Sequence, residues 1–231
     1  MVNKLTTLDK AVLATLIYYD ILDFPLDLMS LEKCLINPKR IFSGFRGKVD
    51  LEKIIDSLIN LQEQMLIEEK NGFYFLKGRR ELFDLYIYKR KLSDLKWKKA
   101  QRAVRWLAAV PYLRIIFGSG SSAMNNTDDK SDLDVLIVVK AGRIWTARFL
   151  TTALLSILRV RRRKGESIAP DKICLNHYIT DKSLRTPFES LYNAQTYRHL
   201  VPILEIRTKL FGILDLTEEF YEVNDWIKKY I

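Results

Sequence analysis

Residues Phe117–Val138 have the sequence FGSGSSAMNNTDDKSDLDVLIV, and this stretch decides the fold of the C-terminal part of the chain. It begins inside an apolar run, Leu113–Gly118, that ends in glycine and is typical of a buried strand. Small residues follow, and a second apolar run occupies Ser131–Val139. The pattern predicts two neighbouring strands with a short helical segment between them.

Two aspartates, Asp132 and Asp134, stand at the start of the second predicted strand. Alternate side chains of a strand share a face, so both carboxylates are expected to project from the same edge. Two carboxylates a few ångströms apart repel each other unless a cation lies between them. Oxygen ligands on a hard divalent ion indicate Mg²⁺.

The Gly118-Ser119 turn supplies the second half of the expected site. Glycine lets the backbone approach a ligand closely, and amides at a helix start with a serine hydroxyl suit phosphate oxygens. A Gly-Ser turn or an Asp-x-Asp pair is weak by itself, the second being common as a loop cap or surface pair. Twelve residues separate Ser119 from Asp132, and a strand pattern precedes each motif, which makes the combination more specific. Together they fit in-line attack on a phosphoryl group.

This arrangement resembles the polymerase-beta-type nucleotidyltransferase superfamily, and most of all its minimal nucleotidyltransferases. The likeness is close over residues 113–140 and looser to about residue 200, and it leaves out residues 1–110. It implies that Gly118 and Ser119 hold a nucleoside triphosphate and that Asp132 and Asp134 bind one or two Mg²⁺ ions. The implied reaction moves a nucleoside monophosphate to a hydroxyl acceptor.

One feature departs from the family pattern, in which a later strand contributes a third acidic residue. The candidate strand here is KICLNHYIT (172–180), whose central polar residue is Asn176, while Asp171 and Asp181 stand only at its ends. An amide ligates Mg²⁺ weakly or binds a nucleotide, but it cannot accept a proton near neutral pH. His177 is expected on the opposite side of the strand, as a packed residue more often than a replacement base. Two hypotheses follow: an enzyme with a relocated or substrate-assisted base, or a degenerate domain that binds nucleotide without turnover.

The N-terminal part predicts three helices and a hairpin. The helices are expected over Leu8–Tyr19, over MSLEKCLI (29–36) with Ser30 as its N-cap, and after Asp50 as the cap of the third. An Asn71-Gly72 pair between two β-type runs is a strong hairpin signal.

These elements predict a winged helix-turn-helix module, joined to an α/β nucleotidyltransferase-type domain with a small mixed sheet in an α+β chain. We expect the winged-helix-like domain over 1–78, a basic connecting helix over 79–110 and the nucleotidyltransferase domain over 111–231. The third helix carries four acidic residues against Lys53 alone, which disfavours DNA binding and favours a packing, regulatory or protein-contact role.

Charge is unevenly distributed in this chain of net charge +10. Residues 1–78 hold 10 basic and 11 acidic side chains, and the remainder holds 28 basic and 17 acidic. The predicted helix 79–109 has 10 basic and 3 acidic residues, and a second basic cluster runs from Arg159 to Lys164. The helix 79–109 has a structural explanation as a solvated helix face, and the cluster from Arg159 to Lys164 has one as cations at a helix C-terminus. The alternative for both is a binding surface for a polyanionic acceptor such as RNA, or for a protein.

The two cysteines, Cys34 and Cys174, lie in apolar contexts without metal-type spacing. Together with the lack of a secretory leader, they predict reduced buried thiols in a cytoplasmic protein. The longest apolar stretch, Phe149–Leu158, is too short to cross a bilayer, so no membrane partner is expected.

Overall fold

The computed structural model describes residues 4–163, 165–166, 168–206 and 216–231, with Asn176 described in its main chain only. The chain separates into two compact units, Met1–Tyr88 with Trp226–Ile231, and Lys89–Asp225. We call these the N-terminal and C-terminal units. Each unit combines helices with its own sheet, which confirms the α+β class.

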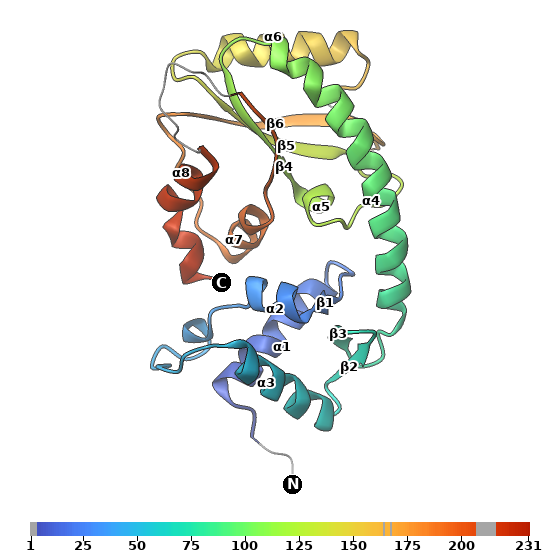
Figure 1. Cartoon of the computed structure of the whole chain (residues 1–231), viewed down its shortest axis with the longest axis vertical. Coiled ribbons are helices and arrows are strands. Elements are labelled where there is room, and N and C mark those ends of the chain that lie inside the picture. Colours follow the sequence, from blue (N-terminus) through green and yellow to red (C-terminus); the bar gives the residue numbers. More distant parts are fainter. Residues whose placement is uncertain (1–3, 164, 167, 207–215) are drawn as a thin grey trace. The chain divides into compact units, whose positions relative to one another are not determined.

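Between residues 4 and 76, the N-terminal unit has three helices, a 3₁₀ turn and a three-stranded antiparallel sheet of order β1-β3-β2 (Figure 1). Its elements are α1 (Thr7–Asp20), β1 (Leu26–Asp27), α2 (Leu28–Cys34), η1 (Pro38–Arg40), α3 (Leu51–Glu63), β2 (Ile67–Lys70) and β3 (Phe73–Leu76). The predicted hairpin is confirmed. Asn71 and Gly72 connect β2 to β3 with φ of 54° and 82°, the positive pair that a tight two-residue turn requires.

Side-chain caps begin all three helices of this unit. Asp50 caps α3 as predicted, accepting from the Lys53 amide at 3.1 Å. The prediction of Ser30 as the cap of α2 is wrong. The Ser30 amide instead donates to Asp27 Oδ1 at 2.8 Å, because the helix begins at Leu28, before the stretch that the apolar pattern marked.

The C-terminal unit is built on a mixed four-stranded sheet of order β6-β5-β4-β7. Its strands are β4 (Leu113–Ser119), β5 (Leu133–Val139), β6 (Ile173–Thr180) and β7 (Val201–Glu205), and its helices include α5 (Gly120–Ala123), α6 (Ile144–Ile157), α7 (Leu191–Arg198) and α8 (Leu216–Val223). β4 is antiparallel to β5 and β7, whereas β5 and β6 are parallel because α6 forms the crossover between them.

The two faces of this sheet have different covers (Figure 1). Val135 and Ile137 of β5 belong to a core shared with α6 and with the C-terminal half of α4 (Glu81–Trp106). The alternate residues of β5 face α7 and α8. On this face, Phe117 of β4 is in register with Leu136, and its ring centroid lies 5.6 Å from that of Phe220. The even-numbered residues of β5, including Asp134, therefore belong to the α7 and α8 face.

The predicted long basic helix is present as α4, followed by a 3₁₀ turn, η2 (Leu107–Ala109). The boundary between the two units falls within α4, at Tyr88 and Lys89, and a C-terminal 3₁₀ segment, η3 (Asp225–Lys229), spans the second boundary. None of the helices in the described ranges has the length and apolar character needed to span a membrane.

Candidate metal and nucleotide site

The site forms where β4, β5 and β6 lie side by side. Asp134 of β5 is opposite Ser119, the last residue of β4, and on its other side it is in register with Cys174 of β6. Residues in register on neighbouring strands share a face. The pairing therefore brings a hydroxyl, a carboxylate and a thiol together on one face of the sheet.

Asp132, which directly precedes β5, belongs to the same group. Ligand atoms of Asp132, Asp134 and Cys174 all lie within 4.8 Å of one another. Such a spacing suits a single cation bound by several side chains. The structure thus brings together the two aspartates that the sequence paired, and adds Cys174 to them.

The backbone at the Ser119–Gly120 turn lies against Asp134. Gly120 has φ +65°, and a Cβ atom placed there would come 2.8 Å from Asp134 Oδ2. A side chain at this position would be strained and would also displace the carboxylate. Further along α5, the Ser122 hydroxyl donates to the Asp132 carbonyl at 3.4 Å. Gly120 is therefore the glycine that the site geometry requires.

Gly118 has a different structural reason. Its missing side chain makes room for Trp97 of α4, since a Cβ atom would lie 2.3 Å from the indole ring. This contact lies on the α4 and α6 face, away from Asp134. Packing explains the glycine, and its predicted contact with a triphosphate stays a prediction.

Arg162 provides the one cation bonded to the aspartate pair among the residues described. Its Nη1 donates to Asp132 Oδ2 at 2.6 Å, while Nε and Nη2 donate to the Glu166 carbonyl at 3.2 and 3.0 Å. The main chain holds Arg162 in place, because its amide donates to the Ile173 carbonyl at 3.0 Å. One arginine therefore partly neutralises two neighbouring carboxylates.

The basic cluster from Arg159 to Lys164, to which Arg162 belongs, follows α6 and is not part of its last turn. α6 ends at Ile157, and Arg159 follows in the left-handed region with φ 57°. The chain then runs beside β6 and turns Arg162 toward the site. Lys164, which the prediction included, lies outside the described residues.

The pKa values of Asp134 and Cys174 show that Arg162 only partly compensates the negative charge of the two aspartates. Burial raises the pKa of Asp134, and repulsion from Asp132 adds to that rise, although Cys174 and Arg162 oppose it. Burial, followed by the charges of both aspartates, raises the pKa of the Cys174 thiol to about 11. At neutral pH Cys174 is therefore a protonated thiol and a poor proton acceptor.

Cys174 is the residue of β6 that lies in register with Asp134. The pairing of β5 with β6 shifts by one residue after Cys174, so that Leu136 opposes His177. Asn176, the predicted occupant, lies in this bulge, and its side chain is outside the described part of the chain. The sequence cannot show which residue of β6 meets Asp134, because a bulge changes the register without any composition signal.

The acidic residues at the two ends of β6 do not complete the site. Asp171 forms ion pairs with Lys96 and Lys99. Asp181 accepts from Arg114 Nε at 3.0 Å and from the Ala141 amide at 2.8 Å. Both carboxylates are held elsewhere by cations of the fold.

His177 has the environment of a packed residue. Its ring lies 6.4 Å from the Tyr197 ring, and burial lowers its pKa below the usual value, which favours the neutral form. A neutral imidazole beside the Tyr197 ring agrees with the packing interpretation.

Sequence reasoning missed three residues of this site: Gly120, Arg162 and Cys174. Gly120 was visible as the third residue of the Gly-Ser-Gly run. Arg162 carried only the general signal of a basic cluster, and Cys174 only that of a buried thiol.

No protein-family model matches the chain, and no curated protein or solved structure does so either.

Proposed function

We propose that the protein is a Mg²⁺-dependent nucleotidyltransferase that moves a nucleoside monophosphate from a nucleoside triphosphate to a hydroxyl acceptor. One observation carries the proposal. Ligand atoms of Asp132 and Asp134 lie within 4.8 Å of each other, and the Ser119–Gly120 turn lies against Asp134 beside them. This is the arrangement that a metal-bound triphosphate needs.

The donor set decides which groups would hold the ion. The carboxylates of Asp132 and Asp134 suit Mg²⁺, which takes few protein ligands and fills its shell with water and phosphate oxygens. The Cys174 thiol is a soft ligand and does not suit Mg²⁺. When bound, the ion would neutralise charge that develops on the phosphates and align the acceptor oxygen with the leaving group.

Ser119 and Arg162 are assigned to the triphosphate. We expect the Ser119 hydroxyl and the main chain of the turn to donate to phosphate oxygens. Arg162 donates to Asp132, and a guanidinium binds phosphate with the same paired geometry as it binds a carboxylate. With an ion held by the aspartate pair, Arg162 would be available to bind a phosphate oxygen in place of Asp132.

In the reaction, the acceptor oxygen attacks the α-phosphorus and forms a new phosphorus–oxygen bond. The bond from the α-phosphorus to the bridging oxygen breaks, and pyrophosphate leaves. The acceptor proton goes to a phosphate oxygen or to water, because Cys174 is protonated at neutral pH and cannot take it. This predicts slow turnover with weakly acidic hydroxyls.

A second function, nucleotide binding without transfer, is favoured by Cys174 and Arg162. A thiol stands in register with Asp134 where a third carboxylate is expected, and Arg162 supplies a permanent cation to Asp132. Such a domain would sense nucleotide rather than consume it.

The test measures Mg²⁺-dependent transfer of label from an alpha-labelled nucleoside triphosphate, with pyrophosphate release as a second readout, across a panel of hydroxyl acceptors. We expect Asp132→Asn with Asp134→Asn to abolish transfer. Asp171→Asn removes a nearby carboxylate that the fold has already paired, and should leave transfer intact. Equal transfer by the aspartate double variant and the wild type would refute the assignment.

Cys174→Asp separates the two functions, since it places a carboxylate in the third position. If the missing acid limits turnover, this variant should transfer faster than the wild type. Tight nucleotide binding by calorimetry, with no pyrophosphate release from either protein, would favour the sensing function instead.

A further inference from the structure

The part of α4 that belongs to the C-terminal unit exposes a stripe of basic residues. Its members recur every three or four positions and so lie on one face of the helix. The stripe consists of Lys91, Leu95, Lys98, Arg102, Arg105 and Trp106, all of them exposed. The opposite face is buried through Ala100, Val104 and Leu107. From Lys91 to Trp106 the stripe spans roughly 22 Å.

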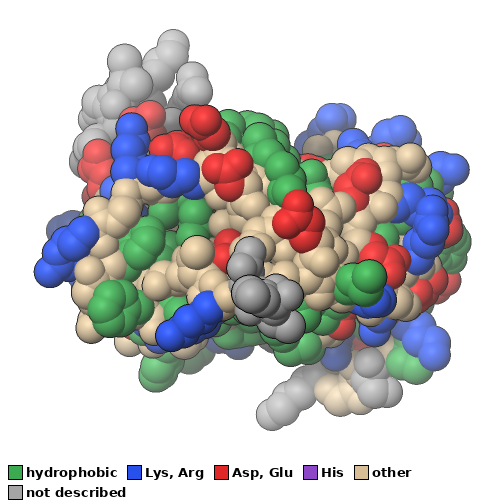
Figure 2. All heavy atoms as spheres, turned by 90° about the horizontal axis from the view of Figure 1, so that it is seen from below, with side chains coloured by type: hydrophobic (Ala, Val, Ile, Leu, Met, Phe, Trp, Pro, Cys, Tyr) green, Lys and Arg blue, Asp and Glu red, His purple; other side chains and the backbone are tan. Residues whose placement is uncertain are grey.

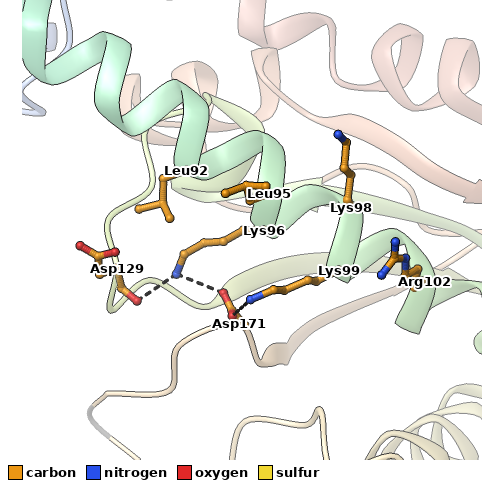
Figure 3. A pocket seen from close by; sticks show the side chains of 8 residues that line it. All are labelled: Leu92, Leu95, Lys96, Lys98, Lys99, Arg102, Asp129 and Asp171. Atoms are coloured by element: carbon orange, nitrogen blue, oxygen red, sulfur yellow. Dashed lines mark hydrogen bonds and ion pairs between the residues drawn. The ribbon is translucent and has the colours of Figure 1, made fainter.

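Most charges of the stripe have no carboxylate partner. Lys96 and Lys99, at the side of the stripe, are paired with Asp171, and Lys96 also donates to the carbonyls of Asp129 and Ser131 (Figure 3). Within the described ranges, no ion pair or hydrogen bond engages the side chains of Lys98, Arg102 and Arg105. In Figure 3 Lys98 points away from Asp171, whereas Lys96 and Lys99 reach toward it.

This one-sided charge differs from other parts of the surface. Residues 89–106 hold eight basic side chains and one acidic one, Asp94. On the face drawn in Figure 2, acidic and basic side chains are interspersed. A concentrated positive field of this kind attracts polyanions.

Two hollows lie along the stripe. A cleft of about 390 Å³ runs between Leu92, Leu95, Lys98, Arg102 and the loop residues Asp129 and Asp171. A second, open depression of about 420 Å³ is lined by Arg102, Arg105 and Trp106. The Trp106 side chain is 63% exposed and Leu95 is 59% exposed. An uncovered indole between two arginines offers a stacking surface within a phosphate-binding environment.

We propose that this stripe binds a single-stranded nucleic acid. Unpaired cations at successive turns of one helix would follow a phosphodiester backbone, and Trp106 would stack on an unpaired base. A duplex offers no base face to Trp106, and an acidic protein would pair with the cations but offers no base to stack on the indole. Single strands therefore satisfy both features of the surface.

One contact connects α4 with the residues of the candidate site. Lys96 holds the Ser131 carbonyl at 2.8 Å, and Ser131 directly precedes Asp132. The use of a bound single strand as the hydroxyl acceptor rests on the proposed function, whereas its binding does not.

The test measures the anisotropy of a labelled single-stranded RNA of about 15 nucleotides over a range of salt concentrations. Arg102→Ala with Arg105→Ala should weaken binding and flatten the salt slope by about 1.4, since each phosphate contact on a single strand contributes about 0.7. Trp106→Ala should weaken binding about tenfold and leave the slope unchanged.

Matched controls keep charge and aromatic content equal. Arg46→Ala with Lys182→Ala removes two exposed cations elsewhere, and Trp145→Ala removes an indole that is 77% exposed on α6. Both should bind RNA as the wild type does. Equal losses in the stripe variants and their controls would overturn the proposal, and circular dichroism of each variant excludes misfolding as the cause.

Competition fixes the class of partner. Single-stranded DNA of the same sequence should compete, whereas a duplex and poly-glutamate should compete far less. If poly-glutamate displaces the RNA as well as a single strand does, the stripe is a site for acidic protein and the proposal is wrong. Asp132→Asn with Asp134→Asn should still bind RNA, so failure of the proposed reaction and failure of this inference are separate results.

Discussion

Two pairs of carboxylates lie around strands β5 and β6, and the fold treats them differently. Asp171 and Asp181 flank β6, and each is bonded to cations that the fold supplies, Lys96 with Lys99 for the first and Arg114 for the second. Asp132 and Asp134 lie within reach of each other and share one arginine. The first pair is neutralised by its own structure, and the second is left with excess negative charge.

The pKa values follow this difference. Asp171 is desolvated, yet its bonds to Lys99 and Lys96 lower its pKa below the usual value. Desolvation and the neighbouring Asp132 raise the pKa of Asp134. A carboxylate kept near another one, at a cost in stability, suggests a ligand cation that completes the site.

The largest expected effect comes from supplying that cation. At a Mg²⁺ concentration of 100 times its Kd, binding to the folded state contributes about 2.7 kcal/mol, which raises the unfolding midpoint by roughly 5 to 10 °C in a protein of this size. Differential scanning fluorimetry with Mg²⁺ and then with EDTA measures this shift. Asp132→Asn with Asp134→Asn should remove it, and Asp171→Asn should keep it. A shift that persists in the aspartate double variant would place the ion elsewhere.

Removing a neutralised carboxylate should have the next largest effect. Asp181→Ala removes the carboxylate that is bonded to Arg114, whose side chain is 14% exposed, and the one that accepts from the Ala141 amide. We expect a loss of about 2 kcal/mol in the free energy of unfolding, measured by urea denaturation. Arg185→Gln breaks an exposed ion pair with Glu189 and should cost less than about 0.5 kcal/mol. Equal losses would show that burial of the Asp181 pair adds nothing.

Local patterns in the sequence predicted the elements on which both pairs lie. The apolar runs marked β4 and β5, the Asn71-Gly72 pair marked the hairpin, and the alternation of side chains placed Asp132 with Asp134. The partners of these residues were not predictable in the same way. Cys174 meets Asp134 through the register of a bulged strand, and Arg162 reaches Asp132 through the path of a loop. Both depend on tertiary pairing that composition and periodicity do not encode.

The turn beside Asp134 allows a sharper comparison between two glycines. Gly120 and Gly142 both have positive φ, +65° and +74°, but only at Gly120 does a Cβ atom meet a neighbour, Asp134 Oδ2 at 2.8 Å. Alanine should cost about 1 kcal/mol at either position from backbone strain. Gly120→Ala should cost about 1 kcal/mol more and weaken the Mg²⁺-dependent shift, whereas Gly142→Ala should leave that shift unchanged. Urea denaturation and fluorimetry of the two variants provide the measurement, and identical results would mean that the turn does not constrain the carboxylate.

The smallest expected effect is that of Asp134→Asn, which should raise the free energy of unfolding, whereas Asp181→Ala lowers it. Because the pKa of Asp134 is higher in the folded state than its usual value of 3.8, the neutral carboxyl stabilises the fold, fully below pH 3.8, and this contribution is lost as pH rises through the folded pKa. Asn cannot ionise, so in EDTA at pH 7 Asp134→Asn should be more stable than the wild type. The gain should be about 0.5 kcal/mol, since solvent and Arg162 screen the repulsion from Asp132. This gain in stability should vanish at low pH. In saturating Mg²⁺ the wild type should be more stable than the variant, because only the wild type has both carboxylates to bind the ion. A variant less stable than the wild type in EDTA at pH 7 would mean that Asp134 is as well compensated as Asp181.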